Sequence, residues 1–391
     1  MKVRKANLKT EERASLALRG LYEQFGYKKY KMGRFEEYSL YAENKDFLAG
    51  DKVLTFTDLD GRLMALKPDV TLSIIKNTNA TRGSREKLYY IENVYRESKE
   101  SHNFKEITQM GLEYIGDIDL YGITEVVSLA VRTLKTISPR YILELSHMSF
   151  VVELLKSMEI TDLVRNKMLK LIRNKNINGI AELANQLNLS ERQRCVLCKI
   201  PTLYGEPQKT LKIARKLALT EGMIEAVDEL EAVFNALKVL NTSKNVQVDF
   251  SLVNDIDYYN GIIFKGYLEE LPRSVLAGGQ YDSAMDMFSK KAGALGFALY
   301  LTELSRMNDS KPAFDVDAVV LYDEETDLLG LLECVQELTK DGESVRVEKY
   351  MPEYLRYKVL YKFEKEGLVT LEENHCEDEE GRKQTGGEEA C

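Results

Sequence analysis

The sequence predicts an α+β fold, in which an antiparallel sheet is flanked by helices and is followed by a small α/β unit. The first observation is Leu88–Gly116, which reads as two strands joined by the polar linker Lys99–Phe104. The second is a stretch of about 150–243, where apolar residues recur at helical spacing almost without interruption. The third is an alternation of strand-like and helix-like segments beyond Pro312.

These observations divide the 391 residues into three parts. Residues 1–312 form a core domain that contains the helical insertion at about 150–243. Residues 313–375 form the small C-terminal α/β domain. Residues 376–391 are polar, acidic and Gly-containing, so we expect a disordered tail.

The elements follow from local patterns. Thr10–Gly26 is predicted to be a helix, which Thr10 caps and Gly26 closes. The apolar face of this helix carries Ala14, Leu18, Leu21 and Phe25. Leu120–Thr136 also follows a helical pattern, and Gly293–Met307 is predicted to be the helix that ends the core. The last domain reads as β-α-β-α-β, with Glu353–Glu364 as its second helix.

Composition excludes several classes of protein. The net charge of −9 disfavours a dedicated nucleic-acid binder. No apolar run is long enough to cross a membrane, so we expect a cytoplasmic protein. Cys195 and Cys198 form a C-x-x-C in a helical, basic context without a second pair, which favours two helix thiols over a metal or redox site. The three histidines are dispersed, and we expect no metal and no cofactor.

The predicted hairpin carries an unusual polar face. Because side chains alternate along a strand, Gln109, Gly111 and Glu113 share one face, beside a neighbouring strand that bears Arg96. A cation, a carboxylate and an amide around a small gap are the groups that a zwitterionic amino acid needs. Solvated polar residues on an exposed antiparallel sheet produce the same alternation, so both interpretations stay open at this point.

Five segments together resemble the catalytic core of the histidyl-tRNA synthetases, which have the class II aminoacyl-tRNA synthetase fold. They occur in the family's order: the hairpin, KPDVT at 67–71, DIDYYNGIIF at 255–264, AGGQYD at 277–282 and ALGFALYL at 294–301. The resemblance extends from roughly Glu11 to Met307 and is weakest in the helical insertion.

The resemblance implies a histidine pocket. In that family, the segment like KPDVT serves the α-ammonium, which falls on Asp69 and Thr71, and the first hairpin strand supplies an arginine for the carboxylate, here Arg96. Glu113 and a tyrosine of the DYY segment face the two imidazole nitrogens, which suits the hydrogen-bonding capacity of the ring. The residues so implied are Asp69, Thr71, Arg96, Gln109, Glu113, Tyr258, Tyr259 and Tyr281.

Three departures from the synthetase pattern concern ATP. Asn254 and Glu303 stand where the synthetases carry arginines for adenylation, and the hairpin loop is shorter, with Lys105 as the only near equivalent of its arginines. Loss of one such stabilising group typically costs about a hundred- to a thousand-fold in rate. A glutamate near a triphosphate is also repelled by it. The sequence therefore predicts that the amino-acid pocket is kept and the ATP site is lost.

This combination is similar to the regulatory subunits of ATP phosphoribosyltransferase. The resemblance implies a non-catalytic subunit in the first step of histidine biosynthesis, which takes histidine as its effector. It implies assembly with a short-form catalytic subunit, whose activity and feedback control require this subunit. It also implies a homodimer within a hetero-oligomer, a hetero-octamer in that family, with no membrane or tRNA partner. The helix face of Ala14, Leu18, Leu21 and Phe25, with its neighbouring strands, falls where class II synthetase cores pair their subunits, so we expect the homodimer contact there.

Other interpretations remain at this stage. The chain could be an active or divergent histidyl-tRNA synthetase, or a synthetase-like protein with another binding role. Asp69, Gln109 and Glu113 could also be inherited polar groups that bind no ligand.

Overall fold

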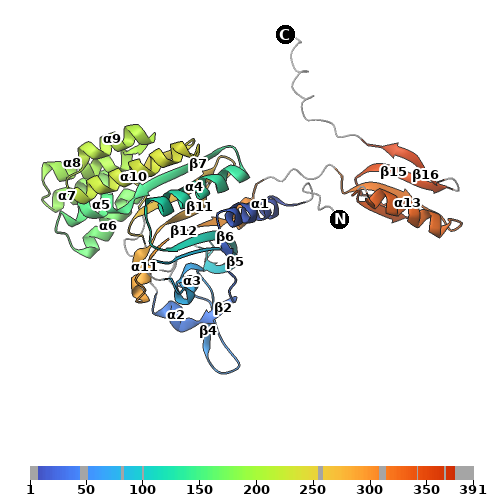
Figure 1. Cartoon of the computed structure of the whole chain (residues 1–391), viewed down its shortest axis with the longest axis horizontal. Helices are drawn as coiled ribbons and strands as arrows, with labels where there is room; N and C mark the ends of the chain where they lie inside the picture. The colour runs from blue at the N-terminus through green and yellow to red at the C-terminus, as the bar shows by residue number, and fades with distance from the viewer. Residues whose placement is uncertain are drawn as a thin grey trace, which may run out of the picture. The chain divides into compact units, whose positions relative to one another are not determined.

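The computed structural model describes residues 8–44, 52–80, 83–98, 101–253, 259–307, 314–340, 342–364 and 367–374. Residues 10–307 form one compact unit and residues 314–374 form another (Figure 1). The expectations for Asn254, Tyr258 and the tail 376–391 lie outside the described residues.

A nine-stranded sheet organises the larger unit. The predicted hairpin forms its strands β5 and β6, which pair antiparallel from Arg85 opposite Gly116 to Glu97 opposite Phe104. The predicted antiparallel sheet is therefore confirmed, with two parallel pairings toward its edges, β1 with β5 and β7 with β9. In spatial order the strands are β1 (Lys28–Lys29), β5 (Arg85–Glu97), β6 (Phe104–Gly116), β12 (Gly293–Tyr300), β11 (Ser274–Gln280), β10 (Ile262–Leu268), β7 (Tyr141–His147), β9 (Val246–Asp249) and β8 (Tyr204–Gly205).

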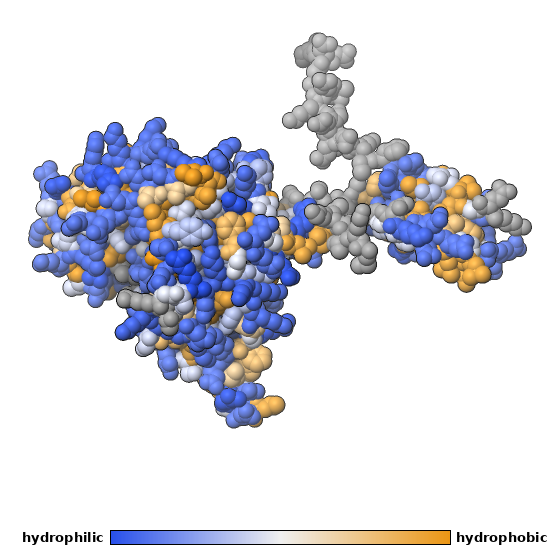
Figure 2. All heavy atoms as spheres, in the orientation of Figure 1, coloured by the Kyte–Doolittle hydropathy of each residue, from blue (hydrophilic) through white to orange (hydrophobic). Residues whose placement is uncertain are grey.

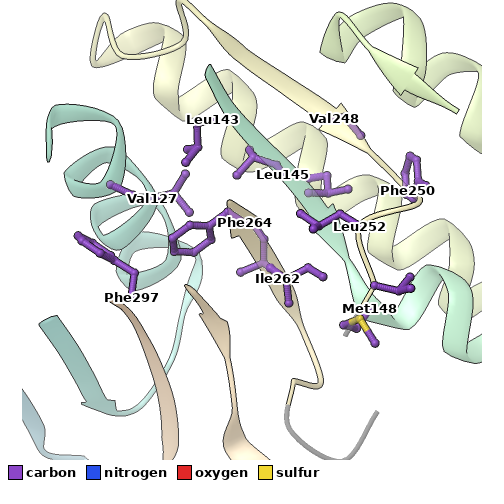
Figure 3. Packing of buried hydrophobic residues seen from close by; sticks show 14 of the residues in the cluster. Val127, Leu143, Leu145, Met148, Val248, Phe250, Leu252, Ile262, Phe264 and Phe297 are labelled. Carbon is purple, nitrogen blue, oxygen red and sulfur yellow. The ribbon is translucent and has the colours of Figure 1, made fainter. Parts of the chain in front are cut away.

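One face of this sheet packs on α1 (Thr10–Gln24) and α4 (Leu120–Ile137). Figure 3 shows Val127 of α4 facing Phe264 and Phe297 of the sheet, whose ring centroids are 6.2 Å apart. Tyr22 of α1 is fully buried, and its hydroxyl lies 2.9 Å from Thr133 Oγ1 of α4. Burial of these large apolar side chains is the main stabilising term for this face.

The helical insertion lies where the apolar spacing predicts it. Its loops use local signals, such as the capping box of Ser190 and Gln193 at the start of one helix. Its buried residues are continuous with the core of the sheet, because they belong to the same hydrophobic cluster. The helices are α5 (Met148–Lys156), α6 (Asp162–Arg173), α7 (Ile177–Gln186), α8 (Glu191–Lys199), α9 (Pro207–Leu217) and α10 (Glu221–Val239).

Shorter elements cover part of the opposite face of the sheet. A three-stranded sheet is formed by β2 (Phe35–Glu37), β4 (Leu63–Leu66) and β3 (Thr55–Thr57), with α2 (Tyr38–Ala42) beside it. The helices α3 (Thr71–Asn77) and α11 (Asp282–Met287) contribute Ile74 and Met285 to a second buried cluster, which includes Tyr90 of β5. This second cluster encloses the polar face of the hairpin.

The prediction of a helix over Gly293–Met307 is wrong. Gly293–Tyr300 forms strand β12, and only Leu301–Leu304 is helical, as α12. β12 is a central strand that is buried on both faces, so its sequence reads as a nearly continuous apolar run. Periodicity alone does not separate such a strand from a buried helix.

The second helix predicted for the C-terminal domain is also wrong. Its residues form strand β15 (Tyr357–Glu364), in which Val359, Tyr361 and Phe363 alternate with period two. The unit is a four-stranded sheet in the order β14-β13-β15-β16 with one helix, α13 (Leu328–Lys340). Its other strands are β13 (Val316–Leu321), β14 (Val345–Glu348) and β16 (Gly367–Glu373).

The surface of the larger unit is mainly hydrophilic on the face that Figure 2 displays. Among the described residues, no helix combines the length and apolar character needed to cross a lipid bilayer.

Candidate functional site

Cross-strand register gathers polar and small residues on the sheet face opposite α4. Glu113 of β6 pairs with Gly296 of β12, which in turn pairs with Gly279 of β11. Two rows away on the same face, beyond the pair of Gly111 and Ala298, Gln109 pairs with Tyr300. Directly paired residues point to the same side of a sheet, so these side chains share one face.

Glu113 lies at the centre of this face with only 2% of its surface exposed. The Thr71 hydroxyl, at the start of α3, donates to Glu113 Oε1 at 3.0 Å. The Tyr281 hydroxyl, just before α11, donates to the other carboxylate oxygen. Burial raises the pKa of Glu113 to about 8, although both hydroxyl bonds oppose the rise. Without a ligand, the carboxyl is therefore largely protonated at neutral pH.

Gly296 and Gly279 form a glycine floor, meaning that they leave the space in which the side chains of Glu113 and Tyr259 lie. A Cβ on Gly296 would lie 1.8 Å from Glu113 Oε2 and 2.4 Å from the Leu112 carbonyl oxygen. Likewise, a Cβ on Gly279 would lie 2.8 Å from a ring carbon of Tyr259. Because these two glycines lack side chains, Glu113 and Tyr259 lie flat on neighbouring strands.

Asp69 and Arg96 form the charged edge of the site. Asp69 Oδ1 accepts from the Leu72 backbone N–H at 3.0 Å, and Oδ2 lies 3.3 Å from Arg96 Nη2. Arg96 Nε also donates to the Pro68 carbonyl at 2.7 Å. Burial raises the pKa of Asp69, and the positive charge of Arg96 opposes this rise. A carboxylate and a guanidinium side by side can hold an ammonium and a carboxylate of one ligand.

Gln109 is a further polar group that is buried on this face. Its side chain is 2% exposed, yet Nε2 has no hydrogen-bond partner within the described part of the chain. A buried donor without an acceptor typically costs about 1–3 kcal/mol. Next to it in the ladder is Glu92, which is paired with the fully buried Lys67 at 2.6 Å.

The aromatic wall includes residues that sequence reasoning missed. Burial raises the pKa of Tyr259, and it does the same for Tyr90, which is 1% exposed. Tyr300 interacts electrostatically with both of these phenols. The alternation of β5 places Tyr90 on the polar face and could have identified it. The sequence pattern misses Tyr300 and Gly296, because it predicts a helix where β12 lies.

The structure thus brings Asp69, Thr71, Arg96, Gln109, Glu113, Tyr259 and Tyr281 together, whereas Tyr258 lies outside the described residues. Glu303 lies on α12 and is ion-paired with Arg306 at 2.7 Å. Lys105 is exposed on β6.

Two cysteines of the helical insertion lie apart from this site. Cys195 and Cys198 occupy one helix, α8, and burial raises the pKa of the Cys198 thiol. Within the described ranges, no group of three or more His, Cys, Asp or Glu residues is arranged to hold a metal ion.

The chain is similar to a known protein family and to several known proteins. The family described as histidyl-tRNA synthetase matches residues 2–304. The ATP phosphoribosyltransferase regulatory subunit of Clostridium acetobutylicum is 26% identical over 375 residues, which cover 92% of this chain and 92% of that protein. The protein of the same name from Oceanobacillus iheyensis is 29% identical over 285 residues, which cover 72% and 69%.

Solved structures show the fold. A Bacillus halodurans structure titled ATP phosphoribosyltransferase regulatory subunit/histidyl-tRNA synthetase has a TM-score of 0.73 at 24% identity, covering 87% of this chain and 88% of that one. The Nostoc histidyl-tRNA synthetase has a TM-score of 0.72 at 16% identity, covering 93% and 91%. A chain of the ATP phosphoribosyl transferase complex from Thermotoga maritima has a TM-score of 0.59 at 21% identity, covering 73% and 96%.

The match over residues 2–304 covers most of the sequence, and the class II synthetase fold is that of the solved structures. The chain therefore belongs to the histidyl-tRNA synthetase family, and its relatives among curated proteins include regulatory subunits of ATP phosphoribosyltransferase.

Proposed function

We propose that this chain is a non-catalytic regulatory subunit of ATP phosphoribosyltransferase, which binds free histidine and confers feedback control on a short-form catalytic subunit. The names of its curated relatives support the regulatory role. The fold shared with a chain of a solved ATP phosphoribosyl transferase complex supports assembly with a catalytic partner. The observation that carries the histidine assignment is the buried Gln109–Glu113 face beside the Asp69–Arg96 pair.

Each part of histidine finds a complementary group in this arrangement. The α-ammonium binds Asp69, and the carboxylate binds Arg96, so the zwitterion replaces the 3.3 Å ion pair between those side chains. The Gln109 amide then donates to a ligand oxygen instead of remaining unpaired. The imidazole lies between Glu113 and Tyr259, with a hydrogen bond at each nitrogen.

Glu113 supplies the proton that selects an imidazole. At neutral pH the ligand-free carboxyl holds a proton, and a free imidazole, with a pKa of about 6.5, holds none. When the two meet, the carboxyl donates to the unprotonated ring nitrogen, and the two groups share that one proton in a hydrogen bond. An apolar side chain in the same place would leave Glu113 without a partner.

Two features of this chain support the absence of adenylation. Glu303 places negative charge on α12, and its neighbour Arg306 is occupied in an ion pair with it. Asn254 carries no charge, where the resembling synthetases have an arginine. Phosphoryl chemistry needs fixed positive charge where negative charge develops.

The second candidate is an active histidyl-tRNA synthetase, and the family match supports it. Histidine-dependent pyrophosphate exchange separates the two candidates, and we expect none above background. Exchange at an ordinary synthetase rate would replace the regulatory assignment by the enzymatic one.

The binding test uses Glu113→Ala with Glu106→Ala as its matched control. Glu106 is an exposed glutamate of the same strand, and strand alternation places it on the other face. Calorimetry should show histidine binding to the unmodified chain and about a ten- to hundred-fold weakening in Glu113→Ala. Glu106→Ala should bind histidine like the unmodified chain.

Inhibition of the assembled complex tests the regulatory part. Glu113→Ala should still activate a short-form phosphoribosyltransferase, yet it should need correspondingly more histidine to inhibit it, because binding and inhibition are linked. If binding weakens while the inhibition curve stays unchanged, feedback uses another site.

A further inference from the structure

The two tyrosines of the pocket are contributed by separate segments, which a small polar cluster holds together. Tyr259 precedes β10, and Tyr281 follows β11. We propose that Asn260 and Asp282, the residues that follow these tyrosines, form a clasp that positions both phenols around the ligand. This inference rests on the proposed function and makes Asp282 a positioning residue for histidine binding.

The clasp consists of reciprocal hydrogen bonds. The Asp282 backbone N–H donates to Asn260 Oδ1 at 3.1 Å, and Asn260 Nδ2 donates to Asp282 Oδ2 at 3.3 Å. The Asn260 backbone N–H also donates to the Gln280 carbonyl at 3.1 Å. Together these bonds fix the relative positions of the two backbone segments, and therefore the points from which both tyrosine side chains extend.

The Asp282 carboxylate extends the clasp to β12. Its Oδ1 accepts from the Ala294 backbone N–H at 2.8 Å, and its Oδ2 accepts from Gln280 Nε2 at 2.6 Å. The Tyr281 backbone N–H donates to the Ala294 carbonyl at 2.8 Å. Two bonds thus hold Tyr281 itself and the following Asp282 against the strand that carries Gly296.

The segment after Tyr259 is fixed on its other side as well. Met148 N–H donates to the Gly261 carbonyl at 2.9 Å, and Ser149 Oγ donates to the Asn260 carbonyl at 3.2 Å. A Cβ on Gly261 would lie 2.2 Å from Gln280 Oε1, so the two segments approach more closely than a side chain permits. Tyr259 therefore enters the pocket from a backbone held on both sides.

Asp282 affects ligand binding indirectly, because it fixes the positions of Tyr259 and Tyr281. Its carboxylate bonds are to Asn260, Gln280 and Ala294, whereas Tyr281 carries the hydroxyl that donates to Glu113. Loss of the clasp should loosen that hydroxyl bond while the apolar core around α11 remains packed.

A double-mutant cycle tests this mechanism. In the unmodified background, Asp282→Ala should weaken histidine binding about tenfold. In a Tyr281→Phe background the hydroxyl is already absent and only the contribution through Tyr259 remains, so the same change should weaken binding less, by under about threefold. Asp286→Ala is the matched control, because Asp286 is an exposed aspartate of the same short helix, and it should leave the affinity within about twofold.

Equal losses in both backgrounds, no loss in the first, or an equal loss in Asp286→Ala would each overturn the clasp. If Asp282→Ala does not fold, Asn260→Ala decides, because it removes the reciprocal bonds but keeps the bonds of Asp282 to Gln280 and Ala294. Asn260→Ala should weaken binding in the same direction, and unchanged affinity would overturn the proposal.

A readout without ligand separates this inference from the proposed function. In chains labelled with ¹³C at the glutamate carboxyls, Glu113 is assigned by comparison with Glu113→Gln. Because the Tyr281 hydroxyl lowers the pKa of Glu113, Asp282→Ala should raise that pKa above its value in the unmodified chain. An unchanged pKa would overturn the clasp. An unmodified chain that binds no histidine would overturn the proposed function instead, and the titration would still decide the clasp.

Discussion

At the scale of the residue, Glu113 has two properties that oppose each other. It is buried beneath α3 and α11, and it is the ionisable group that faces the proposed imidazole. Its pKa rises from an ordinary value of 4.5 to about 8, which means that folding disfavours the charged form. The Glu113 side chain therefore lowers the free energy of unfolding at neutral pH, although its position is suited to binding.

Replacing Glu113 by Gln should stabilise the chain at alkaline pH. Between pH values of about 4.5 and 8, the unfolded chain loses the Glu113 proton while the folded chain keeps it, so stability falls as pH rises. Glu113→Gln removes this penalty and should gain about 2–4 kcal/mol near pH 8. Near pH 4 both states are protonated, and the gain should vanish. Urea unfolding at the two pH values measures the difference, and an equal gain at both would contradict this account.

Histidine binding should exchange few protons between pH values of about 6.5 and 8. In this window the free carboxyl carries one proton, and the complex holds one proton shared with the imidazole. Below the window the complex must release a proton, and above it the complex must take one up, so affinity should fall on both sides. Calorimetry in buffers with different ionisation enthalpies counts these protons. An affinity that climbs steadily through the window would indicate that the complex holds no proton, with an ionised Glu113 beside a neutral imidazole.

At the scale of the element, β12 is important because it has no side chain at Gly296. Its residue Gly296 lies under the Glu113 carboxylate, and the neighbouring strand places Gly279 under Tyr259. A helix in this position would leave Glu113 and Gln109 without their neighbouring strand. The small residues of β12 thus support a binding surface as well as tight packing.

Gly296→Ala should therefore cost about 1–3 kcal/mol and weaken histidine binding. Its Cβ would meet the Leu112 backbone oxygen as well as Glu113, and backbone cannot move aside at low cost. Gly20→Ala is the contrasting variant, because Gly20 is an exposed residue of α1 with nothing within 4 Å of its added Cβ. It should stabilise the chain by about 0.5–1 kcal/mol through helix propensity. Thermal unfolding compares the two variants, and a harmless Gly296→Ala would contradict the glycine-floor interpretation.

At the scale of the whole molecule, the division into two units bears on the site. All the described pocket residues belong to residues 10–307, and the smaller unit has its own buried cluster around Val320, Leu331 and Phe363. A chain that ends at residue 312 should therefore fold and bind histidine with unchanged affinity. Calorimetry on the shortened chain tests the proposed domain boundary, which is incorrect if binding is lost.

Homodimerisation remains a prediction with a changed physical basis. Ala14 and Leu18 of α1 are buried in the core of their own chain, so the face expected to pair is already used. Exposed apolar side chains remain on the three-stranded sheet, where Phe35 is 51% exposed and Leu63 is 48% exposed. We expect a dimer by sedimentation at micromolar concentration, and a monomer in Phe35→Asp if this sheet carries the contact. A monomeric unmodified chain would contradict the prediction.

The sequence by itself determined the hairpin and the set of groups on its polar face. Strand alternation is a local property, so the order of residues along the two strands is enough to place Gln109, Glu113 and Arg96 on one side. The helices of the insertion were likewise predictable, because apolar spacing and capping residues act over a few positions. The resemblance then indicated the type of ligand.

Only the tertiary structure decided how these groups meet. Gly293–Tyr300 is a strand because it pairs with β6 and β11. Both of these are separate segments of the sequence. The same is true of the Asn260–Asp282 clasp, of the burial that raises the pKa of Glu113, and of the packing of α1 on its own chain. Each depends on register and solvent exclusion between separate segments, and these arise only when the whole sheet is assembled.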